Sequence, residues 1–272
     1  MERKIMNAVF KVAGIQMNSE VGNEEANLAK ACTMIDEAAK LGAQLIALPE
    51  AFLTGYAPRI LEKKAKLLPL DIVRVLEKKA SETTATIIAG LPYTENDHLY
   101  NSSLLITPQK GLVDMYHKLH LFSCEELNEK RYFTQGKYNP KVYDLGFCTV
   151  GLMICYDIRF PEYARKLALM GAEVIVVIAA WPKKRIQHFI TLSSARAIEN
   201  QCYVLAVNRI GTDDKTEFGG DTTLYNPVGE IESTSVPSDQ EQVVIGSVER
   251  DMIKHVRGKI TYFDDRLKTY DL

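Results

Sequence analysis

The sequence lacks the features that mark disulfide-stabilised domains, metal sites and nucleotide sites. Its five cysteines, Cys32, Cys124, Cys148, Cys155 and Cys202, are scattered and include no CxxC pair, which argues against a disulfide framework and a zinc site. The five histidines show no HExxH spacing, and no GxGxxG or Walker-type loop occurs. We therefore expect neither a metal nor a cofactor.

An excess of charge of one sign and long apolar runs are also missing. With 33 basic and 35 acidic residues the formal charge is −2, and no basic stripe or polybasic amphipathic segment occurs. The most apolar run, residues 174–181, is far shorter than the roughly 20 residues that span a bilayer. Residues 1–11 contain no signal-peptide core. We expect a cytoplasmic protein that binds neither nucleic acid nor a membrane.

What the sequence does contain is an alternation of strand and helix patterns. This alternation predicts a single layered α/β domain over residues 1–272, which ends in a tail at 258–272. The last three strands look like one closing set. Helices are expected at 24–41, 60–83, 162–170, 185–201 and 251–257. Strands are expected at 9–17, 44–48, 85–91, 100–107, 111–116, 141–145, 148–154, 173–180, 202–209, 222–225, 230–235 and 242–247.

Three chemically complementary residues stand where an apolar strand gives way to a loop: Glu50, Lys118 and Cys155. In open α/β sheets, ligand sites gather at the carboxyl ends of strands. Cys155 taken alone reads more readily as an inert core thiol, because free cysteine is among the most buried residue types. Together, the three residues indicate a nucleophile with a base and a cation beside it.

The charges of these residues favour a neutral thiol as the resting nucleophile. An ammonium about 4 Å from a thiolate stabilises it by roughly 4 kcal/mol at an effective dielectric constant of 20, but a carboxylate at that distance largely cancels the gain. We therefore expect Glu50 to act as general base when the sulfur of Cys155 attacks. Lys118 and the backbone N–H of Tyr156 would stabilise the oxyanion. Water activated by Glu50 would then hydrolyse the thioester.

The segments around these residues carry a family resemblance. LPEAFLTGY around Glu50, YHKLHLF around Lys118 and GLMICYDIRFPE around Cys155 resemble, in type and order, the three motifs of the nitrilase superfamily of carbon–nitrogen hydrolases. The resemblance implies a four-layer αββα sandwich and a metal-free triad of Glu50, Lys118 and Cys155. It also implies a homodimer, to whose contacts we assign the tail at 258–272.

The family also has a second glutamate between the lysine and the cysteine. Glu125, Glu126 and Glu129 are all candidates. The spacing to a downstream aromatic residue and glycine fits Glu129, whereas counting from Lys118 favours Glu125 or Glu126. We choose Glu129.

The segment AAWPKKRIQHF…ARAIENQCYVLAVNRIG resembles the ω-amidase-like branch, which implies monoamides of small dicarboxylates as substrates. We expect Trp181 to line the pocket and Arg185 to pair with a substrate carboxylate. Arg185 is equally compatible with a solvated residue that fixes its loop.

Other functions stay open on the sequence alone. The same triad would serve an N-carbamoyl-amine hydrolase or a nitrilase, and a non-catalytic or redox-sensing scaffold could retain the fold. His117 and His120 flank Lys118, but we interpret both as packed or solvated, since strand alternation would put them opposite Lys118. The leading hypothesis is an amidase that acts on a small-molecule amide.

Overall fold

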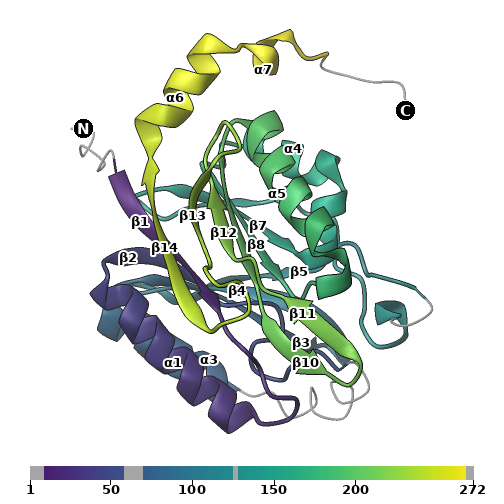
Figure 1. Cartoon of the computed structure of the whole chain (residues 1–272). Helices are drawn as coiled ribbons and strands as arrows, with labels where there is room; N and C mark the ends of the chain where they lie inside the picture. Colours follow the sequence, from purple (N-terminus) through teal and green to yellow (C-terminus); the bar gives the residue numbers. More distant parts are fainter. Residues whose placement is uncertain (1–8, 58–69, 125–127, 268–272) are drawn as a thin grey trace.

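The structure is a computed structural model and describes residues 9–57, 70–124 and 128–267. Two six-stranded sheets lie face to face, and helices cover the outer face of each sheet (Figure 1). Each sheet buries one face against the other and one face against helices. The four-layer αββα sandwich expected from the sequence is confirmed.

The first sheet contains the N-terminal strands and one strand from near the C-terminus. Its members are β1 (Val9–Gln16), β2 (Ala43–Ala47), β3 (Thr86–Glu95), β4 (His98–Thr107), β5 (Gly111–His117) and β14 (Gln242–Glu249). They lie in the order β14-β1-β2-β3-β4-β5. β1, β2 and β3 are parallel, and the remaining pairings are antiparallel.

The second sheet is formed by the second half of the chain. Its members are β6 (Val142–Asp144), β7 (Thr149–Ile154), β8 (Val174–Ala179), β9 (Tyr203–Asn208), β12 (Thr223–Tyr225) and β13 (Ile231–Thr234). Their order is β13-β12-β9-β8-β7-β6, with β7, β8 and β9 parallel at the centre. Every residue of β8, VIVVIA, is buried, as a strand covered on both faces requires.

Two pairs of helices cover the sandwich. α1 (Glu24–Lys40) and α3 (Leu70–Thr83) cover the first sheet, and α4 (Pro161–Leu169) and α5 (Ile186–Asn200) cover the second (Figure 1). α6 (Arg250–Lys259) and α7 (Tyr262–Asp265) follow β14 at one end of the molecule. None of the described helices has the length and apolar character needed to cross a bilayer.

The inner faces of the two sheets pack closely. A Cβ on Gly14 of β1 would lie 2.7 Å from Cγ2 of Thr222 and 3.0 Å from Cγ2 of Val207, so no larger side chain fits there without a shift. This close packing fixes the position of one sheet relative to the other. The strand ends of both sheets are therefore held in a defined arrangement.

In the last third of the chain, one prediction is wrong and one element was missed. The last three strands do not form one set, because β12 and β13 pair in the second sheet while β14 pairs with β1 in the first. A local pattern indicates a strand but not its partner. A hairpin of β10 (Ile210–Asp213) and β11 (Thr216–Gly219) was not predicted, since glycine and charged residues interrupt the apolar alternation there.

The helix expected over 60–83 is described from Leu70 onward, and residues 60–69 lie outside the described residues. The other predicted helices and strands agree with the structure to within a few residues at each end.

Candidate active site

The ends of three strands bring the predicted residues to one place. Glu50 follows β2 and Lys118 follows β5, both in the first sheet, whereas Cys155 follows β7 in the second sheet. Glu129 comes from a 3₁₀ turn, Glu129–Arg131, in the long connection after β5. The site thus depends on both sheets of the sandwich.

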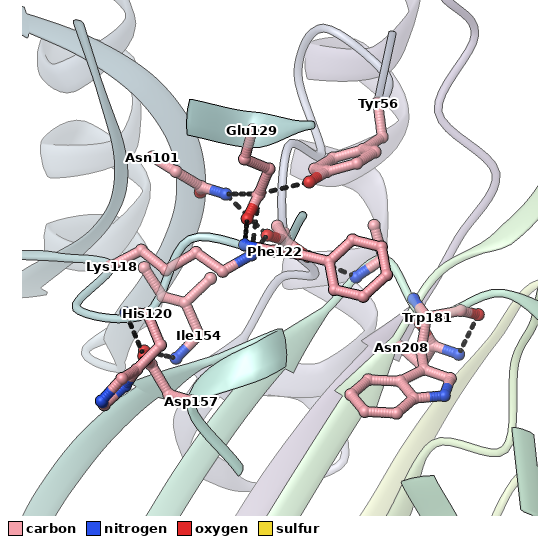
Figure 2. A network of polar contacts seen from close by, with 12 residues as sticks. Tyr56, Asn101, Lys118, His120, Phe122, Glu129, Ile154, Asp157, Trp181 and Asn208 are labelled. Atoms are coloured by element: carbon pink, nitrogen blue, oxygen red, sulfur yellow. Dashed lines mark hydrogen bonds and ion pairs between the residues drawn. The ribbon is translucent and has the colours of Figure 1, made fainter. Parts of the chain in front are cut away.

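Lys118 lies at the centre of the polar cluster (Figure 2). Its Nζ is 2.8 Å from Oε1 of Glu50 and 2.8 Å from Oε1 of Glu129. All three side chains are 0% exposed. One cation therefore bridges two carboxylates away from water.

Glu50 is held by further donors. Its Oε1 accepts a hydrogen bond from Nδ2 of Asn101 at 2.6 Å, and its Oε2 accepts one from the backbone N–H of Ala180 at 2.7 Å. The chain that carries Glu50 passes so close to β3 that a Cβ on Gly90 would lie 2.5 Å from the carbonyl oxygen of Pro49. Glycine at this position lets the turn pack against β3, which orients the carboxylate.

Glu129 is held just as firmly. Its Oε1 accepts hydrogen bonds from the hydroxyl of Tyr56 and, at 3.3 Å, from Nδ2 of Asn101. Its Oε2 accepts the backbone N–H of Phe122 at 2.5 Å. The structure thus brings Glu129 to Lys118, while the rival candidates Glu125 and Glu126 lie outside the described residues.

The electrostatics of this cluster follow from burial and from its unequal charges. Burial alone would lower the pKa of Lys118, but the charges of Glu129 and Glu50 outweigh it and hold this pKa well above 10.5. Burial raises the pKa of Glu129 above 4.5, the charge of Lys118 opposes the shift, and the charge of Glu50 adds to it. Lys118 is therefore a permanent cation, whereas Glu129 binds a proton more readily than a free carboxyl group does.

Cys155 stands at the first position of a 3₁₀ turn, Cys155–Arg159, directly after β7. Its φ is +47°, in the left-handed region that non-glycine residues rarely adopt. Burial and the charge of Glu50 raise the pKa of the thiol well above 9.0, and the charge of Lys118 opposes them. These effects favour the neutral thiol over the thiolate at pH 7, as expected from the opposing charges of Glu50 and Lys118.

A cavity of about 1370 Å³ opens onto Cys155 and Lys118. Tyr156, Trp181 and Arg185, the three residues expected to contact substrate, all line it. Nε1 of Trp181 donates to the carbonyl oxygen of Arg185 at 2.8 Å, which fixes the indole ring in the wall. The cavity is large enough for a small organic amide.

The sequence interpretation missed three residues of this site. Asn101 bonds both carboxylates, Tyr56 bonds Glu129, and the guanidinium carbon of Arg159 lies 4.8 Å from the ring centre of Trp181. Asn101 belongs to an Asn-Ser-Ser run inside β4, where all three residues are buried. Polar residues in the middle of a buried strand were the available signal.

The two histidines beside Lys118 have separate partners. Nδ1 of His117 lies 2.8 Å from the hydroxyl of Ser102, and Nδ1 of His120 lies 2.8 Å from Oδ1 of Asp157. The alternation argument for His120 is wrong because β5 ends at His117. Both histidines are nevertheless packed, each against an aromatic ring.

The arrangement can carry out nucleophilic acyl transfer. It combines a buried thiol and a fixed cation, which both line one cavity, with two carboxylates that contact the cation behind the cavity wall. Within the part of the chain that the structure describes, no group of three or more histidine, cysteine, aspartate or glutamate side chains is arranged to hold a metal ion.

The chain is similar to known proteins over nearly its whole length. A sequence profile for the family described as carbon-nitrogen hydrolase matches residues 11–258. A protein of Pyrococcus abyssi named nitrilase is 35% identical over 271 residues, which cover 96% of this chain and 99% of that protein.

Relatives with amidase names include one bacterial and one bovine protein. The 2-oxoglutaramate amidase of Bacillus subtilis is 32% identical and covers 94% of this chain and 97% of its own length. The omega-amidase NIT2 of Bos taurus is 31% identical, with 95% of each chain covered. Among solved structures, Nit3 of Saccharomyces cerevisiae superimposes with a TM-score of 0.86 at 25% identity and covers 96% of this chain and 97% of that chain.

Proposed function

Because this chain belongs to the carbon–nitrogen hydrolase family, the nitrilase superfamily, we propose that it is a cysteine-dependent amidase of small carboxamides, and of monoamides of dicarboxylates above all. One observation supports this proposal most strongly. The ammonium of Lys118 is buried between Glu50 and Glu129 at a cavity that also contains the Cys155 thiol. A nucleophile, a base and a cation for the oxyanion are thus available to one amide group.

The first half of the reaction forms a thioester. Glu50 accepts the thiol proton of Cys155 while the sulfur attacks the amide carbonyl carbon. The ammonium of Lys118 and the backbone N–H of Tyr156 stabilise the negative charge on the oxygen. The C–N bond then breaks, and the proton on Glu50 passes to the leaving nitrogen, which departs as ammonia.

The second half returns the enzyme to its starting state. Glu50 accepts a proton from a water molecule, whose oxygen attacks the thioester carbonyl. The C–S bond breaks, and the proton on Glu50 returns to the sulfur of Cys155. One amide and one water have become one carboxylic acid and one ammonia. In both halves, Glu129 keeps Lys118 charged and directed at the carbonyl oxygen.

Recognition of the acyl group is assigned to the cavity wall. Arg185 lines the cavity beside Trp181, and its guanidinium carbon lies 5.3 Å from the ring centre of Phe122. A carboxylate at the far end of the substrate would form an ion pair with Arg185. The names of the Bacillus subtilis and bovine relatives, 2-oxoglutaramate amidase and omega-amidase, support a substrate of this kind.

A nitrile is the second candidate substrate class, because the Pyrococcus abyssi relative is named a nitrilase. The same residues would add the thiol of Cys155 across a C≡N bond. An N-carbamoyl amine would be cleaved by the same steps and would release carbon dioxide as well as ammonia. The products therefore separate these activities.

The test is a substrate panel with ammonia release as readout. We would offer glutamine, α-ketoglutaramate, succinamate, carbamoyl amines and short nitriles to the wild type and to Cys155→Ala. The wild type should favour the dicarboxylate monoamides, and Cys155→Ala should lose all hydrolysis. Cys32→Ala, in α1 on the outside of the sandwich, is the matched control and should retain activity. Hydrolysis that persists in Cys155→Ala would overturn the proposed mechanism. A wild type that hydrolyses none of these substrates would leave a scaffold or redox-sensing role as the better hypothesis.

We also propose that residues 1–272 form one domain that assembles as a homodimer through contacts of the 258–272 segment. Ile260 and Leu267 support this proposal, since 54% and 64% of their surfaces are exposed. Removal of residues 258–272 should convert a dimer into a monomer in light scattering. A truncated protein that still has the mass of two chains would place the dimer contacts elsewhere.

A further inference from the structure

Asp157 is a fully buried carboxylate beside the site, two residues after Cys155. It accepts hydrogen bonds from four donors, of which those on His120 and Ile154 are shown in Figure 2. The backbone N–H of His120 is 2.9 Å from its Oδ1, and Nδ1 of the same histidine is at 2.8 Å. The hydroxyl of Tyr116 is 2.7 Å from its Oδ2, and the backbone N–H of Ile154 is at 3.0 Å.

The residues that supply these donors are close in sequence to Lys118 and Cys155, the two proposed reactive residues. Tyr116 and His120 stand two residues before and two residues after Lys118, and Ile154 stands directly before Cys155. Tyr116 lies in β5 of the first sheet, and His120 lies in the segment that follows β5. Ile154 is the last residue of β7 in the second sheet. One carboxylate therefore joins the segment that carries the cation to the segment that carries the thiol.

The backbone at Cys155 needs such support. A non-glycine residue at a φ of +47° persists only where the surrounding structure holds it. The hydrogen bond from the N–H of Ile154 to Asp157 closes the chain around Cys155 from both sides. Loss of this bond would let the backbone at Cys155 relax.

The donors themselves are rigid. Burial, with the charge of Asp157, raises the pKa of Tyr116 well above 10.0, so its hydroxyl stays a donor. The ring of Tyr116 stacks on Tyr163 with centroids 5.7 Å apart, and the ring of His120 stacks on Phe160 at 3.6 Å. Asp157 is thus held between two stacked ring pairs and cannot move without disturbing both.

We propose that Asp157 is a positioning residue for hydrolysis, which fixes the sulfur of Cys155 relative to the ammonium of Lys118. The proposal rests on the proposed function of these two side chains. Asp157 is not among the residues that line the cavity, so it acts through the backbone on either side and not through substrate.

The primary test is Asp157→Asn, which keeps the shape of the side chain. The amide NH₂ must face either the Ile154 N–H or the His120 N–H, so at least one of these bonds is lost. We expect kcat for ammonia release to fall about 100-fold, the order that a misplacement of about 1 Å produces. KM should stay within about twofold, because the cavity walls that bind substrate are unchanged.

Asp114→Asn is the matched control. Asp114 lies on β5, the strand that leads to Lys118, and accepts hydrogen bonds from Lys141 at 2.6 Å and Tyr143 at 3.1 Å. This variant should lower the denaturant midpoint while kcat per folded molecule stays unchanged. The contrast separates a loss of positioning from a loss of folded protein.

Each outcome decides between hypotheses. If Asp157→Asn keeps the kcat of Asp114→Asn while Cys155→Ala is inactive, the positioning proposal alone fails. Activity in Cys155→Ala would instead overturn the proposed function.

If Asp157→Asn does not fold, Tyr116→Phe decides, because it removes a single hydrogen bond from Asp157. We expect about a fivefold lower kcat at constant KM from the loss of this bond to a charged group, and an unchanged kcat would overturn the proposal.

Discussion

Two buried ionic clusters lie near each other and differ in charge balance. In the first, Lys118 faces two carboxylates, so one negative charge is uncompensated when both are ionised. In the second, the guanidinium of Arg209 forms a one-to-one ion pair with the carboxylate of Asp213. The clusters share Tyr56, whose hydroxyl bonds Glu129 and whose backbone N–H donates to Oδ2 of Asp213 at 2.6 Å.

The difference separates proton-transfer chemistry from architecture. Burial raises the pKa of Glu129 and the charge of Glu50 adds to the rise, so this cluster takes up a proton more readily than a free carboxyl group does. The balanced pair has no such excess charge. Arg209 instead donates to the carbonyl oxygen of Ser19 at 2.7 Å and covers the ring of Phe218 at 4.3 Å, which ties distant loops together.

The largest effect should come from Lys118→Met, which leaves two buried carboxylates without a cation. We expect the free energy of unfolding at pH 7 to fall by about 3–5 kcal/mol relative to the wild type. Turnover per folded molecule should fall about 10³-fold, the upper end for loss of an oxyanion donor.

The stability loss in Lys118→Met should depend on pH. Without the cation, the charge of Lys118 no longer opposes the effect of burial on Glu129, so the folded-state pKa of Glu129 should rise further above that of the unfolded chain. The stabilising effect of this raised pKa is present at low pH and is lost as the pH rises through the folded-state value. Denaturant unfolding at pH 5 and pH 8 tests this, and a difference from the wild type that does not change between them would contradict the charge argument.

The next effect should come from Glu129→Gln. Turnover should fall by a few hundredfold, within the range of about 10²–10³ for loss of an oxyanion donor, because Glu129 holds Lys118 at the carbonyl oxygen. The protein should stay folded, and its stability above pH 4.5 should fall less with rising pH than that of the wild type, because the raised pKa of Glu129 no longer contributes. Glu126→Gln is the matched control, and a large loss of turnover there would transfer the role to Glu126.

The sequence was sufficient for the strand ends and insufficient for their supports. Glu50, Lys118 and Cys155 each follow an apolar run, and such runs indicate buried strands from local pattern alone. Register to a downstream glycine also selected Glu129, which lies against Lys118 in the structure.

Side chains that act from a distance leave no such pattern. Asn101 and Tyr56 bond carboxylates that are 51 and 73 residues away in the chain. Asp157 is close to Cys155 in sequence, but its bonds to Tyr116 and His120 span about 40 residues. Only the tertiary fold brings such residues together, just as it pairs β14 with β1.

A smaller effect is expected from Tyr56→Phe, which disturbs the point where the two clusters meet. Loss of the hydroxyl removes a hydrogen bond to Glu129 and should cost about 1.5–3 kcal/mol of stability and about tenfold in kcat. Tyr203→Phe is the matched control, because the hydroxyl of this buried tyrosine also forms a hydrogen bond, which it accepts from the backbone N–H of Glu249 at 3.1 Å. Equal kcat in the two variants would mean that Tyr56 does not support the reaction.

The smallest effect on turnover should come from neutralising the balanced pair. Arg209→Met alone leaves the buried carboxylate of Asp213 without its cation and should lower the free energy of unfolding by about 3–5 kcal/mol. The double variant Arg209→Met/Asp213→Asn should recover much of this loss, because the asparagine oxygen can still accept the N–H of Tyr56. Its kcat per folded molecule should stay within about threefold of the wild type.

Lys118→Met/Glu129→Gln removes one charge of each sign from the other cluster, and it should stay inactive however much stability it regains. If both double variants lost turnover equally, charge balance would not distinguish the reacting cluster from the structural one.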